Sequence, residues 1–219
     1  MIQLERARPL RAFLEFQAVY GSPNFELSSR SSAVMSAVFE AFKPWNITLA
    51  NVSGKQNPAN AGEVAIVFNL QNYRLTFSVG IGAATLLVTN PDWSQEQLIS
   101  QVATAGLEAA RSSTGVTFQK FVTSLLMHVK PERRTLREVS ADFLGLKSPK
   151  ISSPTIKARG FSVYADDFSW VADSSAMHDG ALFLKIIRTF DPNVPFSEIA
   201  RALRADQGEL LGTLKLTVD

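Results

Sequence analysis

A two-residue period of large apolar side chains between Glu63 and Val79 is the feature that most constrains this fold. Two alternating runs, Glu63–Leu70 and Tyr73–Val79, are separated by a two-residue polar connection. Because successive side chains of a strand point to opposite faces, two such runs predict a β-hairpin with one apolar face. A further strand, Ala83–Thr89, extends the hairpin into an antiparallel meander.

Longer helices are predicted where apolar residues recur every three or four positions. Small residues, Gly106 and the alanines that follow it, would let one of these helices lie close to a sheet. A capping box, in which Thr135 and Glu138 satisfy each other's backbone amides, predicts the start of a shorter helix. The longer apolar stripes run over Val34–Phe42, Leu98–Ala110 and Phe196–Leu203.

The order of the predicted elements is typical of the α+β class. Strands mostly follow strands, which favours antiparallel pairing over a doubly wound sheet. We therefore expect a mainly antiparallel curved β-sheet of about 8–9 strands, with two or three longer helices packed on it. This strand-rich order, with one long helix after a meander, resembles the architecture of the SecB-like chaperones, and no site residue is carried over from that resemblance. The other predicted strands are Leu10–Tyr20, Trp45–Val52, Val116–Val129, Thr155–Val171, Ala181–Phe190 and Leu210–Val218.

The length of 219 residues fits one α+β domain covering residues 1–219. Domains have roughly 100–200 residues, so two small domains are the alternative. Residues 145–154 contain two prolines and three serines, which makes them the best linker in the chain. A sub-domain boundary there would separate residues 1–144 from residues 155–219.

Composition excludes several kinds of site. Cysteine is absent, which excludes disulfides, thiolate nucleophiles, zinc fingers and iron–sulfur clusters. The net charge of +2 is too small to predict nucleic-acid binding by itself. We find neither a signal-peptide pattern nor the roughly 18 consecutive apolar residues of a spanning helix, so we expect a cytoplasmic protein with no membrane partner.

The motifs of common catalytic and nucleotide-binding sites are missing from the sequence. Gly80-Ile81-Gly82 precedes a strand pattern, whereas a dinucleotide fingerprint needs a third glycine and a helix. A Gly-x-Ser-x-Gly pentapeptide and a phosphate-binding Gly-Lys-Ser/Thr are both absent. As general base a serine nucleophile could use only His128 or His178, and His128 lies in an apolar strand pattern. Whether the protein is an enzyme stays open at this point, although a non-enzymatic role without a cofactor is favoured.

An acidic loop is the most enriched candidate for chemistry. Four aspartates and one histidine fall within fourteen residues that contain no lysine or arginine. Carboxylate oxygens and an imidazole nitrogen can hold a divalent cation, as a metal-dependent hydrolase would require. The same residue types also form turns in solvated loops. The candidate metal ligands are Asp166, Asp167, Asp173, His178 and Asp179.

A basic segment precedes this loop. Residues 130–159 carry eight basic and three acidic residues. Because guanidinium groups suit phosphate geometry, this segment could contact an anionic ligand or a nucleic acid. A solvated basic face is the alternative, since nucleic-acid readers usually show a larger charge excess. The candidate anion-binding residues are Lys130, Arg133, Arg134 and Arg137.

The missing catalytic motifs favour a binding or assembly module. The alternating hairpin and the long strand Val116–Val129, apolar on both faces, could leave an apolar face that two or three helices do not cover. A large uncovered apolar face marks an interface. We therefore expect self-association through an apolar sheet or helix face, with a second copy or another protein as the partner. Nucleic acid is a less favoured partner.

Overall fold

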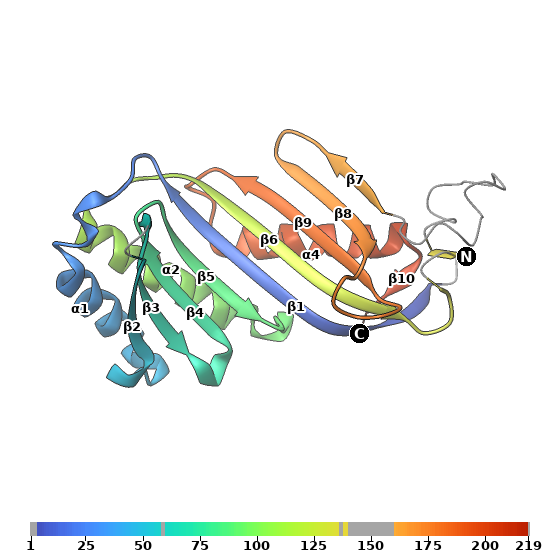
Figure 1. Cartoon of the computed structure of the whole chain (residues 1–219), viewed down its shortest axis with the longest axis horizontal. Helices are drawn as coiled ribbons and strands as arrows, with labels where there is room; N and C mark the ends of the chain where they lie inside the picture. Colours follow the sequence, from blue (N-terminus) through green and yellow to red (C-terminus); the bar gives the residue numbers. More distant parts are fainter. Residues whose placement is uncertain (1–3, 58–59, 136–137, 140–159, 219) are drawn as a thin grey trace. The chain divides into compact units, whose positions relative to one another are not determined.

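The computed structural model describes residues 4–57, 60–135, 138–139 and 160–218 of the chain (Figure 1). Its three long helices are α1 (Ser31–Phe42), α2 (Glu96–Thr114) and α4 (Phe196–Thr213). Short 3-10 helices are η1 (Phe25–Leu27), η2 (Lys43–Trp45), η3 (Leu49–Asn51), η4 (Gln71–Tyr73) and η5 (Trp93–Gln95). The strands are β1 (Glu5–Tyr20), β2 (Val52–Asn57), β3 (Asn60–Leu70), β4 (Leu75–Gly80), β5 (Ala83–Thr89), β6 (Phe118–Pro131), β7 (Phe161–Tyr164), β8 (Phe168–Ser174), β9 (Leu182–Phe190) and β10 (Leu216–Thr217).

The strands join through hydrogen bonds in the order β2-β3-β4-β5-β1-β6-β9-β8-β7, and β10 pairs with β1 in parallel. The pairs within β2–β5 and within β7–β9 are antiparallel. The hairpin predicted from alternation is present, with Phe68 opposite Phe77 in its register. These findings confirm the predicted α+β class with a mainly antiparallel sheet and long helices.

The chain divides into two compact units. Unit 1 comprises Met1–Phe13, Ser124–Arg188 and Arg201–Asp219, and unit 2 comprises Leu14–Thr123 and Thr189–Ala200. The expected boundary at residues 145–154 lies outside the described residues. Among the described helices, none combines the length and the apolar character that crossing a bilayer requires.

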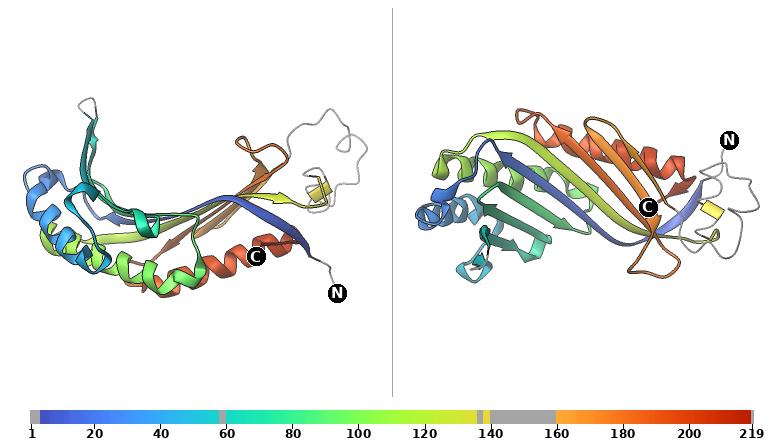
Figure 2. Two further views of the ribbon diagram at one scale, coloured as in Figure 1. Left: turned by 90° about the horizontal axis from the view of Figure 1, so that it is seen from below. Right: turned by 45° about the horizontal axis from the view of Figure 1, so that its top comes forward.

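The core of unit 2 is built on a cluster of phenylalanines between α1 and the meander. Phe42 of α1 meets Phe77 and Phe68 edge-on, with ring centroids 5.4 and 5.9 Å apart. Helices α1 and α2 pack side by side, and both contact the meander strands (Figure 2). Gly115, in the left-handed region at φ 72°, ends α2 by donating its N–H to the Arg111 carbonyl, as expected of a helix C-cap.

The core of unit 1 joins strand β9 to helix α4. Leu182, Leu184 and Ile186 of β9 are buried, as are Leu203 and Leu210 of α4. Within the same unit, the guanidinium Nη1 of Arg188 lies 2.9 Å from both carboxylate oxygens of Asp206. The predicted capping box is also confirmed, because the Thr135 hydroxyl accepts from the Glu138 N–H at 3.3 Å and the Glu138 carboxylate accepts from the Thr135 N–H at 2.7 Å.

The strand predicted over Leu210–Val218 is wrong. Helix α4 continues to Thr213, and β10 covers only Leu216–Thr217. Leu203, Leu210 and Leu214 are all buried, and their spacing of seven and four residues is the helical period. Gly208 lies within this helix, and nothing crowds the position that a Cβ would take there.

The strand predicted over Trp45–Val52 is also wrong, because only Val52 belongs to a strand, and the strand predicted over Thr155–Val171 is described only in part. The segment Trp45–Val52 forms parts of η2 and η3 before β2 begins, with Asn46 in the left-handed region at φ 56°. Residues 155–159 of the predicted strand Thr155–Val171 lie outside the described residues. Its described part is a hairpin, in which Asp166 and Asp167 form the turn between β7 and β8.

Substituting Gly106 tests the close approach of α2 to the phenylalanine cluster. A Cβ at this position would lie 2.8 Å from a Phe77 ring carbon and 2.9 Å from a Phe42 ring carbon, and both rings are fully buried. We expect Gly106→Ala to lower the free energy of unfolding by about 1–3 kcal/mol, as overpacking a core does. Chemical denaturation measures the change.

The matched control is Gly208→Ala in α4, where a Cβ would meet nothing within 4 Å. This variant should raise the free energy of unfolding by up to about 1 kcal/mol, since alanine favours helix more than glycine does. Equal effects of the two substitutions would contradict the close packing at Gly106.

Candidate functional site

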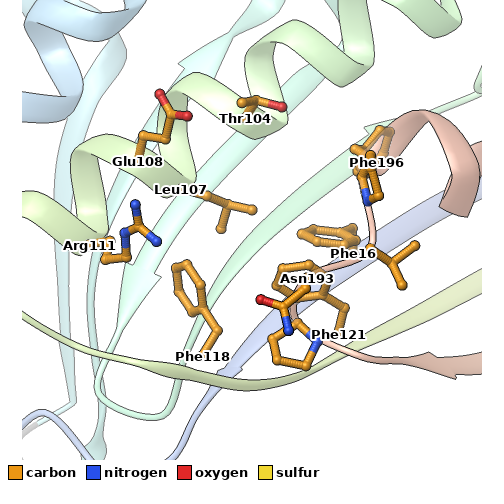
Figure 3. Close-up of a pocket in the computed structure, with 12 residues that line it drawn as sticks. Phe16, Thr104, Leu107, Glu108, Arg111, Phe118, Phe121, Asn193 and Phe196 are labelled. Carbon is orange, nitrogen blue, oxygen red and sulfur yellow. The ribbon is translucent and has the colours of Figure 1, made fainter.

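A pocket of about 270 Å³ lies within unit 2 (Figure 3). Helix α2, the unit 2 parts of β1 and β6, and the segment that leads into α4 supply its walls. Phenylalanines form its floor, and three polar side chains of α2 line one side. The lining residues are Phe16, Thr104, Leu107, Glu108, Arg111, Phe118, Phe121, Pro192, Asn193, Val194, Pro195 and Phe196.

The floor of the pocket is a chain of contacting aromatic rings. Phe16 lies 5.0 Å from Phe121 and 5.1 Å from Phe196 between ring centroids, and Phe118 lies 5.9 Å from Phe121. Phe16 is buried because Leu14, Phe16 and Ala18 occupy alternate positions on one face of β1. The rings therefore present a preformed apolar surface to anything that enters.

The polar side of the pocket comes from one face of α2. Thr104, Glu108 and Arg111 are spaced by four and three residues, which places them on one side of the helix. Arg111 lies in the last helical turn, where a cation complements the helix dipole. In Figure 3 its guanidinium group lies beside the Phe118 ring, while the Glu108 carboxylate points away from the aromatic floor.

A second cluster, in unit 1, brings together the two histidines of the chain. His128 of β6 and His178 of the β8–β9 loop have ring centroids 5.2 Å apart. The His128 Nδ1 lies 2.8 Å from the Ser175 hydroxyl, and the Phe183 ring lies 5.3 Å from the His128 ring. His128 is only 6% exposed. Burial, together with the charges of His178 and Arg11, lowers the pKa of His128 below its usual value.

The five predicted metal ligands lie at separate places in unit 1. Asp166 and Asp167 occupy the β7–β8 turn. Asp173 lies at the far end of β8, next to the β8–β9 loop that carries His178 and Asp179. Asp167 and Asp173 are six residues apart on an extended strand, a distance of about 20 Å. In the described part of the chain, no group of three or more histidines or carboxylates could hold a metal ion. The five residues thus do not converge on one site.

Arg134 serves the fold of unit 1 instead of facing solvent. Its Nε donates to the Glu5 carboxylate, and its Nη2 donates to the carbonyls of Leu214 and Lys215 at 3.1 and 3.0 Å. The same carboxylate accepts the backbone N–H groups of Arg133 and Arg134 at 2.6 and 2.8 Å. These bonds join the start of β1, the end of β6 and the turn before β10.

The other predicted anion-binding residues are dispersed. The side chain of Lys130 is exposed and lies against Gly180 of the β8–β9 loop. Arg133 is exposed and lines a polar pocket with Leu4, Glu5, Arg6, Glu132 and Arg134. Arg137 lies outside the described residues. Anion binding by this set stays a prediction.

Both candidate sites were missed by sequence reasoning for the same reason. The pocket draws on four separate segments of the chain, and its phenylalanines look like ordinary core residues in the sequence. The histidines are 50 positions apart, and in the sequence His178 lies among aspartates, which directs attention to a metal site instead. A local signal existed only for Thr104, Glu108 and Arg111, whose helical spacing places polar groups on one side of α2.

Comparison with known proteins adds little to this geometry. No family model matches the chain, and no curated protein matches it. The chain is similar to the solved structure of a rolling circle replication initiator protein from Geobacillus stearothermophilus. The identity is 10%, the alignment covers 91% of this chain and 80% of that chain, and the TM-score is 0.35. A similarity at that TM-score carries no argument about fold or function.

The Glu5–Arg134 bonds predict how the stability of the protein depends on pH. Burial alone would raise the pKa of Glu5, but the hydrogen bonds from the Arg134 side chain and from two backbone amides lower it below 4.5. The stabilisation is therefore complete above about pH 4.5 and is lost as the pH falls through the lower pKa of the folded state. We expect Glu5→Gln to lower the free energy of unfolding at pH 7 by roughly 1–2 kcal/mol.

Denaturation curves recorded between pH 7 and pH 3 check this expectation, because the difference between wild type and Glu5→Gln should shrink towards low pH. Glu209→Gln, which replaces an exposed carboxylate of α4, is the matched control and should change little at either pH. A Glu5→Gln effect that stays constant down to pH 3 would show that the charge of Glu5 does not stabilise the fold.

Proposed function

We propose that this protein is a non-enzymatic binding module whose pocket in unit 2 takes a small, mainly apolar ligand bearing one carboxylate. The observation that carries the proposal is the chain of contacting phenylalanine rings with the Arg111 guanidinium beside it. Small-ligand sites generally combine a preformed apolar surface with a few placed polar groups, as this pocket does.

The aromatic floor favours an apolar or aromatic ligand body. Burying about 150 Å² of a phenyl ring contributes about 4 kcal/mol at roughly 25 cal/mol per Å². Association costs about 4 kcal/mol or more in lost translational and rotational freedom, so this contribution alone gives weak binding. The polar contact therefore decides which apolar molecules bind.

The charges beside the floor favour a single carboxylate. The Arg111 guanidinium can donate two parallel hydrogen bonds to a carboxylate. Glu108 lies one turn away on the same side of α2 and opposes the approach of a doubly charged phosphate. A monoanion suits this pair better than a nucleic-acid backbone does.

Titration with hydrocinnamate, followed by the NMR methyl signals of Leu107, tests the proposal. We expect a dissociation constant in the range of roughly 0.1–1 mM, and weaker binding of the neutral hydrocinnamyl alcohol. Arg111→Gln should weaken hydrocinnamate binding about fivefold and remove the preference for the acid, because it removes a charge-assisted hydrogen bond.

The matched control is Arg204→Gln, which replaces an exposed arginine of α4 outside the pocket and should leave the titration unchanged. Equal binding of the acid and the alcohol by the wild type would refute the carboxylate. Failure of both molecules to shift the Leu107 signals would refute the pocket as a ligand site.

Self-association stays a prediction with a test of its own. The large exposed apolar side chains are dispersed: Phe25 and Leu49 flank α1, and Val163 and Tyr164 lie on β7, which ends the strand order. An edge strand with exposed apolar side chains can pair with a second copy. If β7 pairs in this way, light scattering at micromolar concentration will show a dimer that Tyr164→Ser weakens. A strict monomer at that concentration would contradict self-association.

The other two predicted functions stay predictions. A metal-dependent hydrolase would use the loop from Asp166 to Asp179, whose carboxylates lie at separate places. An anion- or nucleic-acid-binding protein would use Arg133, Arg134 and Arg137, of which Arg134 is held by Glu5. The pocket in unit 2 needs no rearrangement to act, and this is why we favour it.

A further inference from the structure

We propose that the β8–β9 loop, residues 175–181, is a pH-sensitive latch that the Ser175 hydroxyl holds closed over neutral His128 and that opens when His128 is protonated. The loop covers His128 through two of its residues, Ser175 at 2.8 Å from Nδ1 and the ring of His178, while the ring of Phe183 in β9 also contacts the His128 ring. This inference concerns unit 1 and is independent of the pocket in unit 2.

The hydrogen bonds of Ser175 determine the protonation state of His128. A serine hydroxyl can accept two hydrogen bonds and donate one. The Ser175 Oγ accepts from the backbone N–H groups of Met177 at 3.2 Å and of His178 at 3.0 Å. Its own hydrogen is therefore left for His128 Nδ1, which must accept it. The closed loop thus requires a neutral imidazole with its proton on Nε2.

Protonation of His128 removes the hydrogen bond that its Nδ1 accepts from the Ser175 hydroxyl. A charged imidazole carries a hydrogen on both ring nitrogens, so Nδ1 becomes a donor. It would then face an Oγ whose two acceptor positions are already used by the amides of Met177 and His178. Either the amides of Met177 and His178 or the His128 ring must lose the hydrogen bond to the Ser175 oxygen. Each of these losses loosens the loop.

The same hydrogen bonds argue against two other roles for Ser175 and His128. A serine nucleophile needs a free lone pair on Oγ, and both lone pairs of Ser175 are occupied. A metal ligand needs an unprotonated ring nitrogen, and the closed loop places the proton of His128 on Nε2 while Nδ1 is held by Ser175. A proton-dependent loop anchor uses the contacts as they stand.

The groups that face His128 make protonation costly while the loop is closed. His178 of the loop and Arg11 of β1 act on it electrostatically, and burial also disfavours the charged form. Lys130, two residues further along β6, lies against Gly180 on the same loop. Each of these groups is neutral or positive, so opening the loop to solvent relieves an unfavourable interaction when His128 is charged.

The backbone of the loop is closed by few bonds. The Ser175 N–H donates to the Ala181 carbonyl at 2.8 Å, and the Ala181 N–H donates to the His178 carbonyl at 3.2 Å. Gly180 lies in the left-handed region at φ 69°, which favours glycine. Met177 is 60% exposed. A segment with so few buried contacts opens at low cost once Ser175 is released.

The pH window follows from linkage. Because the pKa of His128 is lowered in the closed state below its usual 6.5, the open state binds the proton more tightly. The latch is therefore fully closed above about pH 6.5 and loosens as the pH falls through the pKa of the closed state.

Hydrogen exchange followed by NMR tests the latch in the full chain. After correction for intrinsic rates, protection of the Met177 and His178 amides should fall severalfold between pH 7.5 and pH 5, because protonation of His128 favours the open loop. Amides of Phe68 and Phe77, which face each other across β3 and β4, serve as references and should not change.

Variants assign the effect to one histidine. In His128→Gln the protection of the two amides should no longer depend on pH, whereas His178→Gln, the matched control, should keep the pH dependence. In Ser175→Ala both amides should exchange rapidly at every pH. A pH-dependent loss of protection that persists in His128→Gln would overturn the proposal.

A direct titration keeps the proposal falsifiable if His128→Gln does not fold. In the wild type, the ring proton signals of both histidines can be followed beside the exchange of the two amides. The amide transition should coincide with titration of His128. Titration of His128 without a change in amide protection would also overturn the latch.

Discussion

The alternation of side chains along extended strands is the constraint from which the rest of this structure follows. On β1 it buries Phe16 between Leu14 and Ala18, and on β6 it buries Phe121, Leu125 and Met127 at odd-numbered positions. Because the period is two, a slip of one residue would exchange every buried side chain for its neighbour. The aromatic pocket floor thus depends on the same register that packs the core of unit 2.

Much of the fold could be predicted because its signals are local. The hairpin over Glu63–Val79 and the stripes of the three long helices depend only on the spacing of neighbouring residues. The strand prediction at the end of the chain is wrong because Leu210, Leu214 and Leu216 are separated by even numbers of residues, which fits a strand, whereas the spacing from Leu203 to Leu210 and Leu214 fits a helix. The sites could not be predicted in the same way, since Phe16 and Phe196, or His128 and His178, meet only after the chain has folded.

Arginines of similar appearance in the sequence have different physical roles here. Arg134 follows Arg133 in a basic segment, yet Glu5 and two backbone carbonyls use its donors. Such an arginine lowers the energy of the fold by satisfying buried acceptors, and it has little left to offer a ligand. Arg111 instead ends a helix beside an aromatic surface, with its guanidinium exposed. The surroundings of a charge, more than its presence, therefore decide between structure and binding.

A comparable distinction separates a reactive serine from a structural one. Ser175 has a histidine beside it, as a nucleophile would, and the distance of 2.8 Å is suitable for proton transfer. What it lacks is an unoccupied lone pair, since two backbone amides already donate to its oxygen. A nucleophilic hydroxyl needs a hydrogen-bonding position that stays unoccupied until the substrate binds. A latch needs a hydroxyl whose hydrogen bonds are all made until the histidine beside it is protonated. Ser175 meets the second condition, and the proposed latch rests on that arrangement.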